Sequence, residues 1–250
     1  MRIAILSDIH GNAFALKAVL EHLRTLQIDK MVNLGDIFYG PVAPRATYDL
    51  LQEYEFVTIR GNQDRQIYES TDVEIEANPT MGFVLNELQG EPLTWLKNIP
   101  VDLQLDDRVY LCHGGPNDDM MYLVENIRSG SSVVRPDKEI LKRLEGQKSS
   151  LILCGHTLIP RSILLSSGQQ IVNPGSVGLP AYFDDLPVNH SMENYSYHAS
   201  FAVIERQNDG WLVEHYKLPY DVEAAAEECL KRRRDDWAYL LRTGRVEQHL

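Results

Sequence analysis

The sequence predicts an α/β fold in which short buried strands alternate with amphipathic helices, followed by antiparallel hairpins. Two observations predict the alternation. Short apolar runs stop abruptly at polar residues, as buried strands do, and the apolar residues between these runs recur at helical spacing. A third observation, pairs of apolar runs joined by turn residues, predicts hairpins in the C-terminal part of the chain.

The first five elements have the order strand, helix, strand, helix, strand. Ile3–Leu6, Met31–Leu34 and Phe56–Ile59 are the apolar runs, and Pro44–Tyr54 is the second helix. This order is typical of a parallel sheet built from right-handed crossovers. The first helix is indicated by apolar residues that share one face, namely Leu16, Val19, Leu20, Leu23 and Leu26.

The middle of the chain has a less regular pattern. Helices are predicted over Gly82–Leu88, Glu91–Asn98 and Pro136–Leu144. Two further apolar runs, Val109–Cys112 and Leu151–Cys154, predict buried strands.

Two hairpins are predicted beyond the last of these strands. The first joins Ser162–Leu165 to Gln169–Val172. The second joins Ser200–Glu205 to residues 210–216, through a turn that contains Asn208, Asp209 and Gly210.

The remaining C-terminal segments predict one long loop and one long helix. Tyr182–His198 is polar and has no clear period, so a long loop is expected there. A final helix is expected over about 222–242, and its basic run Lys231–Arg234 is expected to be a solvated face. No internal repeat or low-complexity linker interrupts the chain, so a single domain is expected over residues 1–250.

The composition argues against several classes of protein. The formal net charge of −12 disfavours non-specific nucleic-acid binding, which needs a basic surface. The three cysteines are widely spaced and lack a CxxC pair, which disfavours a disulfide framework or a structural zinc knuckle. The apolar runs are too short for a signal peptide or a membrane span. A cytoplasmic protein without a membrane partner is therefore expected.

Each predicted buried strand of the α/β part is followed by side chains that can bind a metal ion. Because the carboxyl ends of the strands in an open α/β sheet meet at one crevice, we expect these side chains to lie together. Taken singly, Asp8 or Asp36 could cap the next helix, and His113 could be a core histidine. Their recurrence at five strand ends favours a metal site. In chain order the residues are Asp8, His10, Asp36, Asn62, His113 and His156.

The same residues lie in motifs that resemble a known family. "DIH", "GDIFYG", "GNQD", "CHGGP" and "GHT" occur in the order and spacing of the calcineurin-like metallophosphoesterases. "NPGSVGLP" is similar to the tail motif of their small bacterial phosphodiesterase branch, so the resemblance spans residues 1 to about 178. It implies a sandwich of two mixed β-sheets flanked by α-helices.

The resemblance also implies a dinuclear metal centre. Mixed oxygen and nitrogen ligands suit two Mn ions, with Fe, Zn or Ni as alternatives. A metal-bound hydroxide would attack the phosphodiester, with Asp36, Asn62 and Gln63 as the catalytic residues. Asp8 and His10 match ligands of the first ion, Asp36 matches the bridging carboxylate, and Asn62, His113 and His156 match ligands of the second ion.

Two positions depart from the family pattern. Leu158 stands where the family commonly has a histidine ligand of the first ion, so that ion is expected to bind more weakly and to complete its coordination with water. His190 or His198, from the predicted loop, is an alternative ligand. Gln63 stands where many members have a histidine that protonates the leaving group. Activated aryl diesters are therefore expected to react faster than alkyl monoesters.

Residues in or beside the motifs are candidates for substrate binding. Asn12, Arg60 and Arg161 are predicted to contact phosphate oxygens, because amide and guanidinium groups donate hydrogen bonds to them. Arg65 is a further candidate, and solvation at the surface is the alternative for Arg65 and Arg161. Tyr182 could stack on a base or aryl group, or it could be a packing residue.

The sequence thus predicts a metal-dependent phosphoesterase that acts on a small-molecule or nucleotide phosphate ester, with phosphodiesters favoured. One alternative is a non-catalytic binding or scaffold protein that keeps the fold. Leu158 and Gln63 favour this alternative, whereas the six retained ligands count against it. Another alternative is a phosphoprotein or dinucleotide phosphatase with the same centre, because substrate preference depends on loops that a fold resemblance does not describe.

Overall fold

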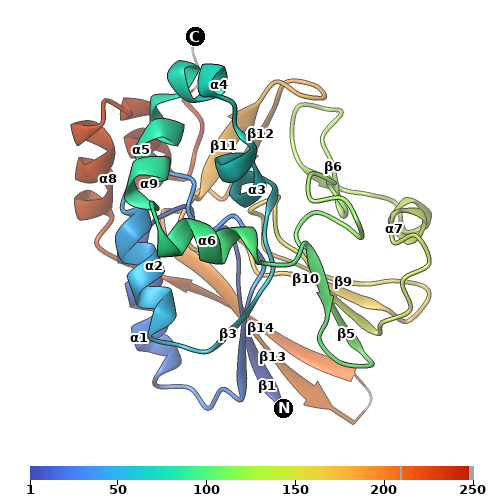
Figure 1. Ribbon diagram of the computed structural model, residues 1–250. Helices are drawn as coiled ribbons and strands as arrows, with labels where there is room; N and C mark the ends of the chain where they lie inside the picture. The colour runs from blue at the N-terminus through green and yellow to red at the C-terminus, as the bar shows by residue number, and fades with distance from the viewer. Residues whose placement is uncertain (209, 248–250) are drawn as a thin grey trace.

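The computed structural model describes residues 1–208 and 210–247 of the chain. Its centre is a sandwich of two five-stranded sheets (Figure 1). The first sheet has the strand order β14-β13-β1-β2-β3, and the second has the order β4-β5-β8-β10-β9. Both sheets contain parallel and antiparallel pairs, which confirms the predicted fold class of two mixed sheets flanked by helices.

The first sheet combines the two ends of the chain. β1, β2 and β3 are parallel, as predicted, with Ile5 opposite Val32 and Val32 opposite Val57. β13 pairs antiparallel with both β1 and β14. Because the last strands extend the sheet that the first strand begins, we propose that the chain forms one domain. The strands are β1 (Arg2–Leu6), β2 (Lys30–Asn33), β3 (Phe56–Thr58), β13 (Ala199–Gln207) and β14 (Gly210–Leu218).

The second sheet has parallel strands in its middle. β8 lies between β5 and β10 and is parallel to both, while β4 and β9 are antiparallel strands at the edges. The pairing of β9 with β10 confirms the first predicted hairpin. The strands are β4 (Asp102–Gln104), β5 (Val109–Cys112), β8 (Leu151–Leu153), β9 (Arg161–Leu164) and β10 (Gln170–Asn173).

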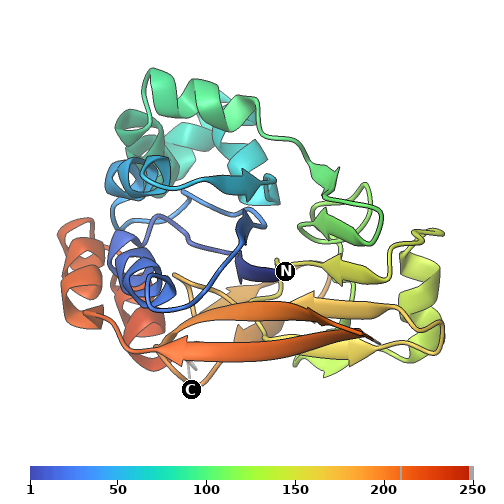
Figure 2. The ribbon, with the colours of Figure 1, turned by 90° about the horizontal axis from the view of Figure 1, so that it is seen from below.

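The alternation of side chains along β1 explains its position between two apolar layers. Ile3 and Ile5 point into the core between the two sheets, where they join Leu111 and Leu153. Ala4 and Leu6 belong to the cluster that also contains the buried face of the first helix. Both faces of the strand are therefore buried, which accounts for its continuous apolar run. Figure 2 shows the strands between the helices on either side.

Helices cover the outer faces of both sheets. α1, α2, α5 and α6 cover the first sheet, and α7 covers the second. All five were predicted, whereas α3 and α4 were not, because their sequences are mainly polar and show no apolar stripe. The helices are α1 (Ala13–Leu23), α2 (Pro44–Gln52), α3 (Asn62–Glu69), α4 (Asp72–Ala77), α5 (Pro79–Glu87), α6 (Glu91–Lys97) and α7 (Asp137–Arg143).

The prediction of one helix over about 222–242 is wrong, because the chain turns between α8 (Val222–Lys231) and α9 (Asp235–Thr243). Arg233 adopts the left-handed conformation at this turn, with φ 57°. The basic run is not a solvated helix face either. The Arg232 guanidinium lies 4.1 Å from the Phe83 ring centroid, and Arg234 pairs with Asp236 at 2.7 Å.

The prediction of a long loop over Tyr182–His198 is also wrong. A hairpin of β11 (Ala181–Asp184) and β12 (His190–Glu193) forms there, near the top of the view in Figure 1. The sequence did not predict this hairpin because the buried face of β12 includes a polar side chain, His190. A smaller hairpin joins β6 (Glu125–Asn126) to β7 (Val133–Val134).

The second predicted C-terminal hairpin is confirmed by the pairing of β13 with β14. Asp209, which was predicted to form part of its turn, lies outside the described residues. Within the described ranges, every helix is too short or too polar to cross a bilayer.

Candidate metal centre

The six predicted metal ligands lie in loops at the carboxyl ends of the strands and at the start of α3. Five of them form two overlapping groups, Asp8–His10–Asp36 and Asp36–His113–His156. Within each group the candidate ligand atoms lie within 4.8 Å of one another. Asp36 is the residue that the two groups share.

The backbone at these ligands is strained. Asp8, His10, Asp36 and His156 have φ values of 56°, 50°, 52° and 67°. A non-glycine residue in this left-handed region costs about 1–3 kcal/mol, and such residues cluster at functional sites. Hydrogen bonds between the loops hold the conformation, because the N–H of Asp8 donates to the Gly35 carbonyl at 2.9 Å and the N–H of His10 donates to the Asp36 carbonyl at 3.0 Å.

The histidine rings present Nε2 to the centre. His10 Nδ1 lies 3.0 Å from the Tyr39 carbonyl oxygen, and His113 Nδ1 lies 2.7 Å from the Leu34 carbonyl oxygen. Because a carbonyl oxygen can only accept, both Nδ1 atoms carry a proton, which leaves Nε2 as the atom of each ring that could bind a metal once it is deprotonated. Among the described residues, Nε2 of His156 has no hydrogen-bond partner.

The oxygen atoms of the centre are only partly satisfied. Asp36 Oδ1 accepts the N–H of Gln63 at 2.9 Å, and Asp36 Oδ2 lies 3.3 Å from His113 Nε2. Asp8 Oδ2 is 3.3 Å from the N–H of His156. In the part of the chain that the structure describes, Asp8 Oδ1, Asn62 Oδ1 and Gln63 Oε1 are buried without a partner. Buried carboxylate, amide and imidazole atoms that lack partners fit divalent ions such as Mn.

Burial and the charges of neighbouring ligands shift the pKa values of the residues in the centre. Burial raises the pKa of Asp8 to about 7, against the opposing charge of His113. Burial also acts to raise the pKa of Asp36, but the positive charge and hydrogen bond of His113 lower it below its ordinary value. Burial acts to lower the pKa of His113, yet the Asp36 carboxylate raises it to about 10. Burial and the His113 charge lower the pKa of His156 to about 4.

Asp64 is a positioning residue that the sequence reasoning did not single out. Its Oδ1 accepts the N–H of Ile37 at 2.9 Å, and its Oδ2 accepts the N–H of Gly61 at 2.9 Å. These bonds tie the loop that carries Asp36 to the loop that precedes Asn62. Burial and the nearby Asp36 charge raise the pKa of Asp64 to about 7. In the sequence, the feature that could have identified Asp64 is its position as the last residue of the "GNQD" motif.

The tail motif "NPGSVGLP" supports the loops of Asp8 and His156. Ser176 Oγ donates to the Asp8 carbonyl at 2.8 Å, and Asn173 Nδ2 donates to the Gly155 carbonyl at 2.8 Å. Gly155 packs so closely that a Cβ there would collide with Ser7 Oγ and would lie 3.0 Å from Asp8 Oδ2. A side chain at this position would therefore displace the Ser7 hydroxyl and crowd the Asp8 carboxylate.

Leu158 lies in an apolar cluster with Leu179 of the tail motif and Trp237 of α9. It is 1% exposed, so nearly all of its side chain is covered by these neighbours. Neither His190 nor His198 belongs to the two ligand groups found in the described residues.

Both of these histidines have other contacts. The Tyr122 hydroxyl lies 2.9 Å from His190 Nε2 and donates to it, because His190 Nδ1 donates to the Val188 carbonyl at 2.7 Å. The His198 ring packs against Tyr197, with 4.6 Å between the ring centroids. The structure therefore gives neither histidine a place as the substitute ligand.

The predicted phosphate contacts are bound to other groups. Asn12 is buried; its Oδ1 accepts the N–H of Ala15 at the start of α1, and its Nδ2 donates to the Gly178 carbonyl at 2.9 Å. Arg60 and Arg65 both bind Asp119, at 2.7 Å and 2.9 Å.

Arg161 pairs with the fully buried Glu125 at 2.9 Å. Asn12, Arg60 and Arg161 therefore have partners within the protein, and their contact with phosphate stays a prediction. Sequence reasoning missed this because Asp119 and Glu125 lie far from the arginines along the chain.

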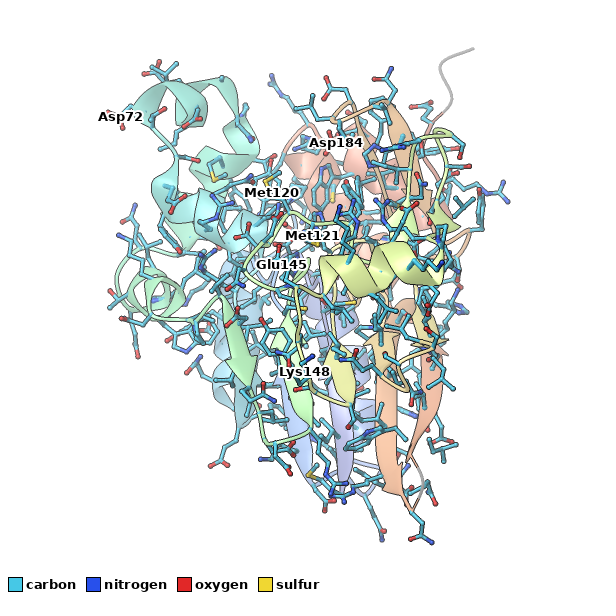
Figure 3. The ribbon with its side chains drawn as sticks, turned by 90° about the vertical axis from the view of Figure 1, so that its right-hand side faces the viewer. Asp72, Met120, Met121, Glu145, Lys148 and Asp184 are labelled. Carbon is cyan, nitrogen blue, oxygen red and sulfur yellow. The ribbon has the colours of Figure 1, made fainter. Side chains whose placement is uncertain are left out.

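The centre opens into a cavity of about 1560 Å³. His10, Asp36, Asn62, Gln63 and His156 contribute to its lining. Figure 3 shows two other lining residues, Met120 and Met121, near the middle of the view, with Asp184 above them. The remaining apolar and aromatic lining includes Tyr122, Leu158, Leu179, Tyr182 and Trp237.

Comparisons with known proteins agree with this geometry. A sequence model described as the calcineurin-like phosphoesterase superfamily domain matches residues 1–190. The uncharacterized protein MJ0912 of Methanocaldococcus jannaschii is 24% identical over 257 residues, and the match covers 94% of each chain. The crystal structure of a metallophosphoesterase from Sphaerobacter thermophilus has a TM-score of 0.74 at 22% identity, covering 98% of this chain and 99% of that one. At this identity, the structural likeness supports the fold.

Proposed function

The chain belongs to the calcineurin-like phosphoesterase superfamily, as a metal-dependent phosphoric ester hydrolase, and we propose that it is a phosphodiesterase with a dinuclear centre. The observation that carries the proposal is the place of Asp36 in both ligand groups. Five of the six predicted ligands group together, and His10, Asp36, Asn62 and His156 line the cavity; this favours an enzyme over the non-catalytic scaffold protein that Leu158 and Gln63 suggested.

The two groups divide the ligands between two ions. Two divalent ions bound there would activate water and neutralise the charge of a phosphoryl group. Manganese suits the mixed oxygen and nitrogen donors. Asp8, His10 and Asp36 would hold the first ion, and Asp36, Asn62, His113 and His156 would hold the second.

The side chains at the start of α3 orient the substrate in this proposal. Asn62 and Gln63 both line the cavity, and the N–H of Gln63 holds Asp36 Oδ1. Their amide groups can donate hydrogen bonds to phosphate oxygens, but they cannot supply a proton to a leaving group at neutral pH. The chain therefore acts best on esters whose leaving group departs without protonation.

The size and lining of the cavity favour a diester. Its volume of about 1560 Å³ leaves room for an organic group on each side of a phosphate. Tyr182 and Trp237 provide aromatic surface for such a group. A monoester would contact this surface on one side only.

The test measures initial rates of bis-p-nitrophenyl phosphate hydrolysis during a Mn²⁺ titration, together with bound metal per chain. We expect saturable turnover, two ions per chain, and slower hydrolysis of alkyl phosphate monoesters. Asp36→Asn is expected to lose both the turnover and at least one ion, while Asp49→Asn, an exposed carboxylate on α2, is the charge-matched control. Absence of turnover with Mn²⁺, Fe²⁺, Ni²⁺ and Zn²⁺ would falsify the proposal.

A further inference from the structure

Three arginines that the motifs do not include line the same cavity as the metal centre. They are Arg128 after β6, Arg135 after β7 and Arg143 at the end of α7. We propose that these arginines form a second anion subsite, and that the substrate is a phosphodiester carrying a second phosphate group. The substrate class rests on the proposed phosphodiesterase function, whereas the subsite itself can be tested by binding alone.

Arg135 connects the cluster to the metal centre. Its side chain is 9% exposed, and its Nε donates to the Tyr122 carbonyl at 3.1 Å. The Tyr122 ring lies 4.9 Å from the His156 ring, centroid to centroid. A single residue, Tyr122, therefore separates the arginine cluster from a candidate metal ligand. The N–H of Arg135 also donates to the Val124 carbonyl, which fixes the backbone of the arginine.

The cluster carries uncompensated positive charge. Arg135 pairs with Glu139 at 3.3 Å, but within residues 1–208 and 210–247 no carboxylate lies within 4.0 Å of the Arg128 or Arg143 side chain. Arg60, Arg65 and Arg161, by contrast, are all paired. One carboxylate against three guanidinium groups leaves a local excess of positive charge in a chain whose net charge is −12.

Arg128 and Arg143 lie close enough to Arg135 for their charges to act on it. Burial lowers the pKa of Arg135, and the charges of Arg143 and Arg128 lower it further. Carboxylates also line the cavity, so the proposed preference for an anion is confined to the arginine cluster. They are Asp36 of the metal centre, Asp118, Asp184, Glu247, and Asp236, which pairs with Arg234. An anion bound at the arginine cluster would relieve this repulsion. The paired N–H donors of each guanidinium group can bind two oxygen atoms of a phosphate group.

The position of the cluster defines the class of substrate. With the reacting diester at the metal centre, the second phosphate lies beyond Tyr122, at the arginines. Tyr122 and Tyr182, whose hydroxyl groups lie 3.0 Å apart, present aromatic surface in the same cavity. A nucleotide derivative with two separate phosphate groups fits these features, because its sugar links the two phosphates and its base can stack on the tyrosine rings.

Binding is tested with two probes that differ by one phosphate, thymidine 5′-monophosphate and thymidine 3′,5′-bisphosphate. Calorimetry on the Mn²⁺-loaded wild-type protein is expected to show about tenfold tighter binding of the bisphosphate. The Arg128→Gln/Arg143→Gln variant is expected to lose this preference, while Arg128→Lys/Arg143→Lys keeps part of it. Arg135 is left unchanged because its hydrogen bond to Tyr122 supports the loop.

Arg206→Gln is the matched control, because Arg206 is exposed on β13 and lies outside the cavity. It is expected to keep the wild-type preference. Circular dichroism and thermal unfolding check each variant, and the single variants Arg128→Gln and Arg143→Gln replace the double variant if it does not fold. Equal affinities in the wild type, or a preference that survives loss of both arginines, would overturn the subsite.

Kinetics separates this inference from the proposed function. The substrates are thymidine 5′-(p-nitrophenyl phosphate) with and without a 3′-phosphate. We expect the 3′-phosphate to lower KM about tenfold, and the double variant to remove that advantage without changing kcat. Binding preference without turnover of either ester would reject the phosphodiesterase function and keep the subsite. Turnover with equal KM values and equal affinities would keep the function and reject the subsite.

Discussion

The Trp237 ring meets the His10 ring edge-on, with 6.0 Å between the ring centroids. Trp237 belongs to α9 and His10 follows β1, so the C-terminal helix pair reaches one of the candidate ligands of the first ion. Leu158 lies in the same apolar cluster as Trp237. Apolar side chains, Leu158 and Trp237, thus lie where the family pattern led us to expect a further histidine ligand.

Leu158→His is expected to raise the affinity of the more weakly bound ion about tenfold, because it adds an imidazole ligand beside His10. The same change is expected to lower the free energy of unfolding by about 2 kcal/mol, because a buried leucine leaves the apolar cluster. Metal-binding calorimetry and denaturant unfolding measure the two effects. Leu158→Met is the control that keeps an apolar side chain, and an unchanged affinity in Leu158→His would show that position 158 does not reach the ion.

Gln63→His is expected to accelerate the release of poor leaving groups by about a hundredfold, because it introduces a group that can donate a proton at neutral pH. The rate for p-nitrophenyl esters is expected to change little, since that leaving group needs no proton. Rates for an alkyl and an aryl diester, measured from pH 5 to 9, compare the two. Gln63→Asn is the control that shortens the amide, and equal acceleration of both esters would contradict a proton-donor role.

Asp64→Asn is expected to lower the free energy of unfolding by about 1–3 kcal/mol, because an amide can accept only one of the two backbone hydrogen bonds that Asp64 now receives. Metal affinity is expected to fall as well, since these bonds position the loops of Asp36 and Asn62. Unfolding and metal titrations measure both quantities. Asp72→Asn, on the exposed helix α4, removes the same charge and is expected to change neither.

Metal affinity is expected to rise with pH, because an ion must displace the protons held by the empty centre. His113 has a pKa of about 10 and Asp8 a pKa of about 7, whereas His156, with a pKa of about 4, is already neutral. Well below pH 7 binding releases two protons, and between about pH 7 and 10 it releases one. The overall metal affinity should therefore rise about a hundredfold per pH unit well below pH 7, and about tenfold per pH unit between about pH 7 and 10.

Calorimetry in buffers with different heats of ionisation counts the released protons directly. An affinity that stays flat between pH 6 and 9 would contradict the protonation of His113 in the empty centre.

Removal of metal is expected to destabilise the fold, because the ions bind the folded state and offset the repulsion among buried Asp8, Asp36 and Asp64. Free Mn²⁺ at a hundred times its Kd would stabilise the protein by about 2.7 kcal/mol. Differential scanning calorimetry with and without EDTA measures the shift in Tm. Asp36→Asn serves as the control, since its Tm should respond much less to the chelator.

Much of the fold was predictable because its elements have regular patterns. The strands of the parallel units, the two hairpins and five helices were all visible as apolar periods. The exceptions lacked such periods. β12 places the polar His190 inside, and the C-terminal helix breaks at Arg233, where neither glycine nor proline marks the turn.

That the candidate ligands lie close together was predictable for a different reason. Each ligand follows a strand, and the topology of a parallel sheet brings strand ends together without any knowledge of side-chain packing. The left-handed backbone at Asp8, His10, Asp36 and His156 was not predictable, because it depends on hydrogen bonds between loops that are distant in the chain.

By itself, the sequence determined the layered fold and the residues that can bind metal, since both follow from local periodicity and from the order of strands and helices. Only the tertiary structure decided which charged side chains remain free. Arg60, Arg65 and Arg161 are paired with Asp119 and Glu125, whereas Arg128 and Arg143 face the cavity. The reason is physical: an ion pair depends on distance in space, and the partners of these arginines come from segments that only folding brings together.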